Sequence, residues 1–448
     1  MLILFTLGVL LYTLGVSIAA LFGNQKAKQW IRGRWQQMKE FRIRRRSKLP
    51  LSIGDGDWIW FHAASLGEFE QGRPVIEAIK KEYPQYRILL SFFSPSGYEV
   101  RKDYPLADEV LYLPSDTALH AKQWLQRHHF VAAFFIKYEF WFNYMKALKE
   151  ANIPLFYISL IFKPESYFFK PYGDWFRKQL RNVTHFFVQD KMTAALLREY
   201  GFDNYTVCGD TRFDRVAAIA QQAKPFPDIE KFINGRKCII AGSTWPPDEK
   251  LLAAFYPKPP DDYCLIIAPH DISESHVAQI KAAFPEAVLY SELDSCQCHT
   301  EAQPYSDEPL CQCHTEAQPS VSVGRNVLVI NTIGILSQLY QYARFVYIGG
   351  GFGVNIHNIQ EPVTFGCPVV FGPKYTDFKE ACDLVNLQGA FSINDATQLE
   401  EIFTRLMTDE AFFAKASETC KTYLASQVGA TEKIMQGFKN ILFSQKTA

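Results

Sequence analysis

Short apolar stretches alternate with amphipathic stretches along most of the chain, and this alternation constrains the fold more than any other feature. The stretch 58–61 reads Trp-Ile-Trp-Phe, and the stretch 66–83 has the spacing of an amphipathic helix. Further strands are expected at 87–93, 109–113, 131–136, 155–158, 185–188 and 205–208. Strands that alternate with helices are typical of parallel sheets with crossover helices. The sequence therefore predicts an α/β fold.

The alternation stops once and then restarts, which predicts two domains. A polar stretch contains Lys224-Pro225-Phe226-Pro227, and we place a linker at 221–236. New strands are expected at 238–241, 264–268, 287–290, 327–330, 345–348 and 369–371. We therefore predict two doubly wound, Rossmann-like domains, 51–220 and 237–427, and a C-terminal helix at 428–448. Ligands bind at the carboxyl ends of strands in such sheets, so we expect the site in a cleft between the domains.

The N-terminal segment differs from the rest of the chain. Residues 1–25 carry no charged side chain and are long and apolar enough to span a bilayer. The segment 26–50 contains ten basic side chains and one acid, Glu40, so it should stay on the cytoplasmic side. We predict a single-pass, uncleaved anchor in the plasma membrane, with the body of the protein in the cytoplasm. A buried core helix is the alternative interpretation of residues 1–25.

The charge outside the basic segment bears on the choice of partner. The formal net charge of the whole chain is zero, so the remaining residues carry more acids than bases. A mildly acidic body lacks the positive surface that nucleic-acid binding requires. We therefore predict that nucleic acid is not a partner.

The ten cysteines fall into two groups. Six lie scattered in apolar surroundings, as small core residues of a reducing compartment do: Cys208, Cys238, Cys264, Cys367, Cys382 and Cys420. The other four lie in the stretch 295–320, where the sequence 296–304 recurs word for word as 311–319. Its Cys-x-Cys-His units could offer soft metal ligands, but their spacing is not a standard zinc pattern. We predict a duplicated surface loop and no metal site; a non-enzymatic, metal-binding membrane protein is the alternative.

Two carboxylates and one cation follow strands of the first domain. Glu68 follows the strand 58–61, and Glu139 follows the strand 131–136. A carboxylate at such a strand end could act as a general base; a carboxylate that merely offsets the helix dipole is the alternative for Glu68. Arg212, after the strand 205–208, could neutralise a phosphate or a leaving group. A surface pair with Asp214 is the alternative for Arg212.

A glycine run marks the second domain. Residues 349–353 read Gly-Gly-Gly-Phe-Gly after the strand 345–348, and a helix is expected to leave this turn. A strand, a glycine turn and a helix N-terminus together are suited to phosphate, although the spacing is not that of a G-x-G-x-x-G motif. The candidate residues for a phosphate, sugar or ribose at this edge are Ser243, Thr244, Gly350, Gly351, His357, Asn358 and Glu361.

These stretches together resemble the 3-deoxy-D-manno-octulosonic acid (Kdo) transferases of lipopolysaccharide synthesis, specifically those that act on lipid A. The stretch from His62 to Glu68 is similar to the family's H-x-x-S-V-G-E, and the stretch 138–141 is similar to its E-x-W. The resemblance implies that Glu68 is the catalytic base and Glu139 a second catalytic carboxylate. The stretch 209–214 resembles G-N-x-K-F-D and implies that Arg212 stabilises the leaving phosphate. The implied nucleotide-binding residues are Pro269, His270, Gly334, Ile335, Leu336, Asn358, Ile359, Gln360 and Glu361.

The resemblance implies a GT-B glycosyltransferase, in which two Rossmann-like domains face a cleft. It implies an inverting transfer of Kdo from CMP-Kdo to the primary hydroxyl of the lipid A precursor, lipid IVA, with no cofactor. The implied partners are CMP-Kdo, the lipid A precursor and lipid of the inner membrane.

Two segments depart from the family pattern. The family often has A-P-R-H-P-E where Pro269 is here followed directly by His270, and its G-E-L reads Gly334-Ile335-Leu336. A GT-B enzyme that uses another nucleotide sugar, such as UDP-N-acetylglucosamine, on a lipid acceptor is therefore one alternative. A sugar-nucleotide epimerase is another, although an N-terminal membrane anchor argues against it.

Overall fold

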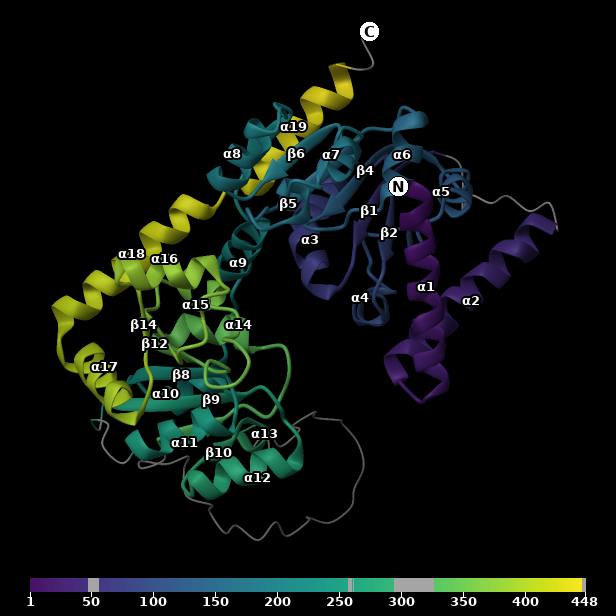
Figure 1. Ribbon diagram of the computed structural model, residues 1–448. Helices are drawn as coiled ribbons and strands as arrows, with labels where there is room; N and C mark the ends of the chain where they lie inside the picture. The colour runs from purple at the N-terminus through teal and green to yellow at the C-terminus, as the bar shows by residue number, and fades with distance from the viewer. Residues whose placement is uncertain (47–55, 257–259, 261, 294–325, 445–448) are drawn as a thin grey trace, which may run out of the picture. The chain divides into compact units, whose positions relative to one another are not determined.

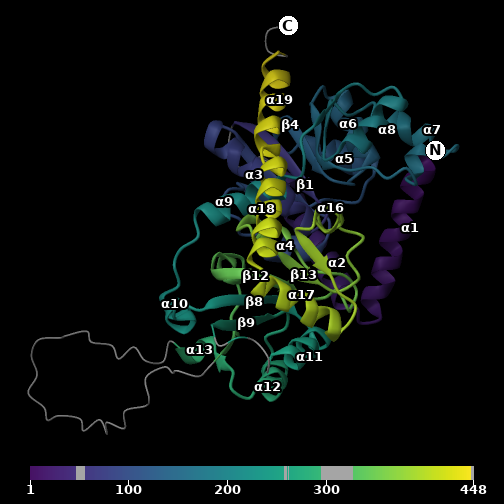
Figure 2. The ribbon, with the colours of Figure 1, turned by 90° about the vertical axis from the view of Figure 1, so that its left-hand side faces the viewer.

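The chain forms two compact units, each built around one seven-stranded sheet (Figures 1 and 2). The computed structural model describes residues 1–46, 56–256, 260, 262–293 and 326–444. Unit 1 comprises Met1–Arg215 and Gln427–Ala448, and unit 2 comprises Val216–Ser426. All strand pairs in the described residues are parallel. The predicted α/β fold with two parallel sheets is confirmed.

The sheet of unit 1 has the strand order β3-β2-β1-β4-β5-β6-β7. The strands are β1 (Asp57–Ala63), β2 (Arg87–Phe92), β3 (Glu109–Tyr112), β4 (His129–Ile136), β5 (Leu155–Leu160), β6 (His185–Val188) and β7 (Tyr205–Val207). From β1 the chain builds outward to β2 and β3, and then returns to add β4 on the other side. The strand order therefore reverses between β1 and β4. A doubly wound sheet binds its ligand at such a topological switch point.

Both faces of this sheet are buried, which explains the unbroken apolar runs of its strands. Successive residues of β1 point to opposite faces: Trp58 and Trp60 belong to one core cluster, whereas Ile59 and Phe61 belong to the other. The helices that supply the covers are α3 (Leu66–Glu82), α4 (Pro95–Arg101), α5 (Ala118–Leu125), α6 (Phe142–Glu150), η1 (Tyr167–Phe169), α7 (Asp174–Leu180) and α8 (Lys191–Glu199).

The C-terminal helix α19 (Ala430–Ser444) belongs to unit 1, although unit 2 precedes it in the sequence. The ring of Phe438 lies 5.2 Å from that of Phe134 on β4. Asp214, on the helix α9 (Thr211–Gln221), accepts hydrogen bonds at 2.6 Å from the backbone N–H groups of Gly429 and Thr431. These bonds fix the start of α19 beside α9.

The N-terminal helix α1 (Leu2–Leu21) is long and apolar enough to cross a membrane, by length and composition, and it packs against unit 1 along one face. The ring centroids of Phe5 and Phe142 lie 4.8 Å apart, and Asn143 Nδ2 donates to Thr6 Oγ1 at 3.3 Å. The other faces of α1 are exposed; Ile3, for example, is 84% exposed. The helix is therefore a candidate anchor that also contacts the body.

Helix α2 (Gln25–Arg46) is fixed to the sheet by two polar side chains. The buried Arg34 donates to the carbonyl oxygens of Phe93 at 2.9 Å and of Leu113 at 3.1 Å. Burial lowers the pKa of Arg34 to about 9. Gln37 exchanges two hydrogen bonds, of 2.8 and 2.9 Å, with the backbone of Tyr112. These bonds satisfy polar groups on the edge strand β3, which would otherwise be open to pairing.

The sheet of unit 2 has the strand order β10-β11-β9-β8-β12-β13-β14, with its switch point between β8 and β12. The strands are β8 (Lys237–Thr244), β9 (Tyr263–Pro269), β10 (Val288–Leu289), β11 (Val327–Val329), β12 (Ala343–Ile348), β13 (Val369–Phe371) and β14 (Ala390–Ser392). The helices are α10 (Pro227–Ile233), α11 (Pro246–Phe255), α12 (Glu274–Ala283), α13 (Tyr290–Leu293), α14 (Leu336–Leu339), η3 (Tyr340–Tyr342), α15 (Gln360–Thr364), α16 (Lys379–Leu387), α17 (Ala396–Thr408) and α18 (Glu410–Gln427).

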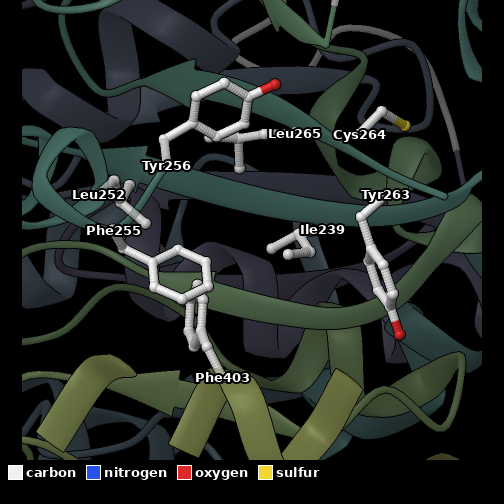
Figure 3. A pocket seen from close by; sticks show the side chains of 8 residues that line it. All are labelled: Ile239, Leu252, Phe255, Tyr256, Tyr263, Cys264, Leu265 and Phe403. Carbon is white, nitrogen blue, oxygen red and sulfur yellow. The ribbon is translucent and has the colours of Figure 1, made fainter. Parts of the chain in front are cut away.

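The core of unit 2 encloses a small cavity of about 10 Å³ (Figure 3). Phe255, Tyr256 and Phe403 are among the side chains that line it. A cavity of this size can hold at most one water molecule. The cavity is therefore a packing gap and not a ligand site.

Polar side chains define where several helices begin. Thr117, Asp190 and Asp395 each accept a hydrogen bond from a backbone N–H in the first turn of α5, α8 and α17. Such caps satisfy N–H groups that have no partner inside the helix.

Three segments of the predicted domain plan differ from the structure or lie outside it. The range 221–236, expected to be a linker, contains α10, whose Ile229 and Phe232 are buried in unit 2. The units meet in the sequence at Arg215 and Val216, inside α9, and residues 427–448 return to unit 1. The duplicated Cys-rich stretch, 295–320, lies outside the described residues.

Candidate active site

Glu68 stands at the carboxyl edge of the unit 1 sheet, in the first turn of α3. Strand β1 ends at Ala63, and Ser65 precedes the helix with an extended backbone (φ −140°). The hydroxyl of Ser65 donates a hydrogen bond to the Glu68 carboxylate. Glu68 is half-buried, so its oxygens can reach a ligand.

Glu139 stands at the same edge, after β4, which is paired with β1 across the switch point. Trp141 Nε1 donates to Glu139 Oε2 at 2.8 Å, and the hydroxyl of Tyr157 donates to the Glu139 carbonyl oxygen at 2.7 Å. The side chain of Glu139 is 15% exposed, and its Oε2 lies 3.4 Å from Nε2 of the fully buried His62. One oxygen of the carboxylate is therefore oriented by the Trp141 N–H group and lies close to the His62 ring.

A short polar chain fixes the His62 ring. Ser91 Oγ lies 2.8 Å from His62 Nδ1 and accepts a hydrogen bond from Trp60 Nε1 at 2.7 Å. The Ser91 hydroxyl donates to the Phe61 carbonyl oxygen at 3.3 Å. Three buried side chains of β1 and β2 thus hold the His62 ring beside Glu139.

Arg212 is paired with Asp210 and not with Asp214, which had been the expected alternative partner. Its Nε and Nη2 atoms lie 2.9 and 2.7 Å from Asp210 Oδ2. Gln71 Nε2 donates to both oxygens of Asp210 at 3.1 Å. Although burial opposes ionisation, the charge and hydrogen bonds of Arg212 hold the pKa of Asp210 below its usual value. Asp214 instead caps the segment before α19.

Tyr138 connects these groups electrostatically. Burial raises the pKa of Tyr138, the nearby charges of Asp190 and Glu68 raise it further, and that of Arg212 lowers it. Thr211 Oγ1 donates to the Gln71 carbonyl oxygen and Gln71 Nε2 donates to Asp210, so the start of α9 with Arg212 lies against α3, which carries Glu68. Unit 1 thus brings together the predicted residues Glu68 and Arg212, and pairing of β1 with β4 brings Glu139 to the same edge.

Three rings are stacked at the carboxyl edge of the unit 2 sheet. The ring of His270, after β9, lies 4.5 Å from Trp245, which follows β8, and 4.5 Å from His357. Trp245 Nε1 donates to His357 Nε2 at 3.0 Å, so His357 carries its proton on Nδ1 when neutral. Burial and the neighbouring His270 lower the pKa of His357. The result is a flat aromatic surface, partly open to solvent.

The glycine run lets three loops approach one another closely. A Cβ at Gly349 would lie 2.3 Å from the Ser243 carbonyl oxygen, and one at Gly351 would lie 2.7 Å from the backbone of Gly372. Gly350 has φ +93°, a region that side chains disfavour. These glycines therefore hold the loops after β8, β12 and β13 together, which leaves their backbone N–H groups in a rigid arrangement.

The prediction of a helix directly after the glycine turn is wrong. Ile356 N donates to the Lys374 carbonyl oxygen, and Lys374 N donates to that of Gly351, each at 3.1 Å. These bonds hold residues 351–356 in a loop paired with the loop after β13, and α15 begins only at Gln360. The helix has five residues, and Asn358 Oδ1 accepts from Gln360 N at 2.9 Å at its start.

The remaining predicted residues of unit 2 lie on the same sheet edge. Thr244 pairs with Pro269 in the strand register, and Ser243 has φ +53°. Gly334 (φ +97°) precedes Ile335 and Leu336 at the start of α14. On the short helix that follows Ile359, Glu361 accepts from Asn358 Nδ2 at 3.3 Å and the buried Gln360 donates to Glu380 at 3.1 Å.

A buried carboxylate, Asp248, joins the loops of unit 2. It accepts hydrogen bonds from the hydroxyl of Tyr347 at 2.7 Å and from the backbone N–H groups of Gly350 at 3.0 Å and Trp245 at 2.9 Å. Burial raises the pKa of Asp248. The carboxylate therefore ties the glycine turn to the start of α11.

Sequence reasoning missed four residues of these two edges. Trp245 and Asp248 lie in a stretch that had been interpreted through Ser243 and Thr244 alone, and Asp210 had been passed over in favour of Asp214. His62 had been treated as part of a motif and not as a partner of Glu139. An aromatic residue directly after a switch-point strand was the available signal for Trp245.

The chain is similar to known proteins along most of its length. Residues 31–215 match the family model described as 3-Deoxy-D-manno-octulosonic-acid transferase (kdotransferase). The 3-deoxy-D-manno-octulosonic acid transferase of Chlamydophila psittaci is 22% identical over 426 residues, which cover 93% of this chain and 92% of the relative. The 3-deoxy-D-manno-octulosonic acid transferase of Aquifex aeolicus is 24% identical, with 78% of this chain and 86% of the relative covered.

A solved structure supports the fold. A crystal structure of UDP-N-acetylglucosamine 2-epimerase superposes with a TM-score of 0.58 and covers 88% of this chain and 98% of its own. The identity is 12%, so the likeness concerns the fold, two doubly wound units in one chain.

Proposed function

Because the chain belongs to the Kdo transferase family of glycosyltransferases, we propose that it transfers Kdo from CMP-Kdo to the primary hydroxyl of a lipid A precursor, lipid IVA. The observation that carries this proposal is the placement of Glu68 and Glu139 after β1 and β4, on the two sides of the unit 1 switch point. Both residues lie within the range that the family model matches.

Glu68 is the general base in this mechanism. Its carboxylate accepts the proton of the acceptor hydroxyl while that oxygen attacks the anomeric carbon of Kdo. The bond from this carbon to the phosphate oxygen breaks, the electron pair leaves with CMP, and the configuration at the carbon is inverted. The Ser65 hydroxyl, which donates to Glu68, keeps one carboxylate oxygen occupied and leaves the other for the proton.

Glu139 and Arg212 act beside the base. Glu139, oriented by Trp141, holds the acceptor or the sugar by a hydrogen bond. Arg212 stabilises the charge that develops on the departing phosphate. Its pairing with the buried Asp210 fixes the direction of the guanidinium.

Unit 2 holds the donor nucleotide. The stack of Trp245, His270 and His357 offers a flat face to the cytosine ring, because bases stack on aromatic side chains. Gly351 and Ser243 supply donors for the phosphate. Gly350 and Thr244 shape the site instead, because the Gly350 N–H donates to Asp248 and the Thr244 hydroxyl donates to Glu249. The remaining proposed donor-binding residues are Pro269, Gly334, Ile335, Leu336, Asn358, Ile359, Gln360 and Glu361.

We propose that α1 and α2 hold the enzyme at the inner membrane, with both catalytic edges on the cytoplasmic side. The exposed faces of α1 are apolar, and those of α2 carry Lys28, Arg32 and Trp35. Basic and aromatic side chains suit a surface of anionic lipid headgroups. The contacts of α1 with Phe142 and Asn143 favour a helix that lies against the body with its outer face in the leaflet; spanning would require these contacts to break.

A transfer assay tests the proposal. Purified protein is mixed with CMP-Kdo, generated in situ, and a tetraacylated lipid A precursor in detergent, and the mass of the lipid product is measured. We expect a gain of one or more Kdo units. No gain with CMP-Kdo, together with a gain from another nucleotide sugar such as UDP-N-acetylglucosamine, would contradict the proposed donor.

A further inference from the structure

An apolar pocket of about 350 Å³ lies within unit 1, beneath α1. Its volume falls in the range of small-ligand sites, about 300–1,000 Å³. The wall is formed by small and aromatic side chains from three segments: Phe5, Gly8 and Tyr12 of α1, Trp30 of α2, and Phe93 and Trp141 of the sheet edge.

One wall of the pocket is also part of the proposed catalytic edge. Trp141 lines the pocket and donates to Glu139 Oε2 at 2.8 Å. The ring of Phe93 lies 5.0 Å from Trp141 and 5.7 Å from Trp30, so three rings form a continuous surface. A group held in the pocket therefore touches the same indole that orients a catalytic carboxylate.

The opposite wall is the candidate membrane anchor. Residues 5, 8, 9 and 12 of α1 face the pocket, and they follow the three-to-four-residue spacing of one helix face. The other faces of α1 expose apolar side chains such as Leu7 and Leu14, which are 52% and 56% exposed. The apolar surface thus continues around α1 from the exposed side to the pocket.

Among the described residues, the side chains that line the pocket carry no charge. Its two hydroxyls, of Thr13 and Ser115, lie 3.3 Å apart and can bond to each other. An apolar ligand loses no ion pair or hydrogen bond in such a site, whereas a charged ligand would lose its hydration without compensation. Trp30 Nε1, which is buried, has no hydrogen-bond partner among the described residues.

We propose that this pocket binds one fatty acyl chain of the lipid acceptor. The inference rests on the proposed function, in which the acceptor is an acylated glucosamine disaccharide. The chain enters from the leaflet side of α1 and packs on Trp30, Phe93 and Trp141. Its headgroup is thereby held at the sheet edge where Glu68 and Glu139 stand, and contact with Trp141 keeps Glu139 in place.

Gly8 offers a direct way to fill the pocket. A Cβ at Gly8 meets no atom within 4 Å, and the same holds for Gly15, which lies on α1 but does not line the pocket. Neither residue has a positive φ, so a side chain strains neither backbone. The substitutions Gly8→Ala, Gly8→Leu and Gly8→Phe form a graded series, and Gly15→Phe is the matched control.

Transfer kinetics are measured with the tetraacylated precursor in mixed micelles. We expect the apparent KM for this acceptor to rise with the size of the side chain, by about tenfold in Gly8→Phe, and to change less than twofold in Gly15→Phe. A KM in Gly8→Phe equal to that in Gly15→Phe would overturn the proposal. The graded series separates occlusion from misfolding, because misfolding lowers the yield of folded protein and leaves the KM of the remainder unchanged.

A cross-linking experiment tests the pocket without relying on turnover. The probe is a glucosamine disaccharide lipid with a diazirine in one acyl chain. Irradiation should label peptides that contain Trp30, Phe93 or Trp141 in the wild type and in Gly15→Phe, and at least fivefold less in Gly8→Phe. Equal labelling in all three would overturn the acyl pocket. If the wild type transfers no Kdo but still shows this labelling pattern, the proposed function fails and the pocket stands.

Discussion

The carboxyl edges of the two sheets share one topology and differ in chemistry. Each edge has its switch point between two central strands, β1 and β4 in unit 1 and β8 and β12 in unit 2. The edge of unit 1 presents Glu68, Glu139 and Arg212, whereas that of unit 2 presents stacked rings and closely packed glycine loops.

Two buried aspartates express this difference most sharply. Asp210 in unit 1 is held ionised by Arg212, and its pKa is lowered although burial opposes this. Asp248 in unit 2 has Tyr347 and two backbone N–H groups as partners, and burial raises its pKa. This contrast matches the roles that we propose: the edge of unit 1 carries charge through the reaction, and the edge of unit 2 binds the flat base of the donor.

The largest expected effect comes from removing the base. Glu68→Gln should lower kcat by about 10³-fold, since general base catalysis contributes about 10²–10⁴-fold. Binding of CMP to the variant should stay within twofold of wild type, because the donor site that we propose lies in unit 2. Steady-state transfer and calorimetric CMP titration measure the two quantities. Glu82→Gln, at the exposed end of the same helix, should change neither; loss of CMP binding in Glu68→Gln would contradict the assignment of the base.

A substitution in the aromatic stack of unit 2 should have the opposite effect: it should weaken the binding of CMP and leave kcat almost unchanged. Trp245→Ala removes the largest ring of the stack and should weaken CMP binding about tenfold, since base stacking contributes about 1–3 kcal/mol. At saturating CMP-Kdo the kcat should remain within about threefold of wild type. Trp35→Ala, an exposed tryptophan of α2, is the control for CMP titration. Normal binding of CMP by Trp245→Ala would show that the aromatic stack is not part of the donor site.

The smallest effects should come from the two aspartates, and their pH dependences should have opposite signs. The pKa of Asp210 is depressed in the folded protein, so its stabilising effect is present above the unfolded pKa and is lost as the pH falls. The pKa of Asp248 is raised, so its favourable contribution is present at low pH and is lost as the pH rises through the folded pKa.

Melting temperatures of Asp210→Asn and Asp248→Asn against wild type, between about pH 4 and 8, measure this contrast. Asp210→Asn should be least stable relative to wild type at neutral pH, by about 1.5–3 kcal/mol for a lost charged hydrogen bond. The melting temperature of Asp248→Asn, relative to that of wild type, should increase as the pH rises. If the stabilities of the two variants relative to wild type changed with pH in the same direction, the pKa values of Asp210 and Asp248 would not be shifted in opposite directions.

The sequence predicted features that depend on residues close together in the chain. The strands at 58–61, 131–136, 238–241 and 345–348 could be located because residues buried on both faces form unbroken apolar runs. Glu68 and Glu139 were recognisable because each directly follows such a strand.

Other features depend on contacts that sequence spacing does not reveal. The stack of Trp245, His270 and His357 joins the ends of three strands, and no local pattern specifies which rings meet. The close approach of Gly349 to Ser243 and of Gly351 to Gly372 likewise requires knowledge of the strand order. Arg212 pairs with Asp210 and not with Asp214. Asp214 instead accepts a hydrogen bond from Gly429, which lies more than two hundred residues away in the sequence, so sequence spacing could not reveal this pairing.

The position of α19 in the core of unit 1 has a consequence for biosynthesis. Ile434 and Phe438 cover the sheet face that carries Ile59 and Phe134, and they are synthesised after all of unit 2. At about 5–20 residues per second, the ribosome needs on the order of tens of seconds between β7 and α19. During that interval the nascent unit 1 exposes part of an apolar sheet, so unit 2 has the opportunity to fold first and unit 1 completes its core only as synthesis reaches α19.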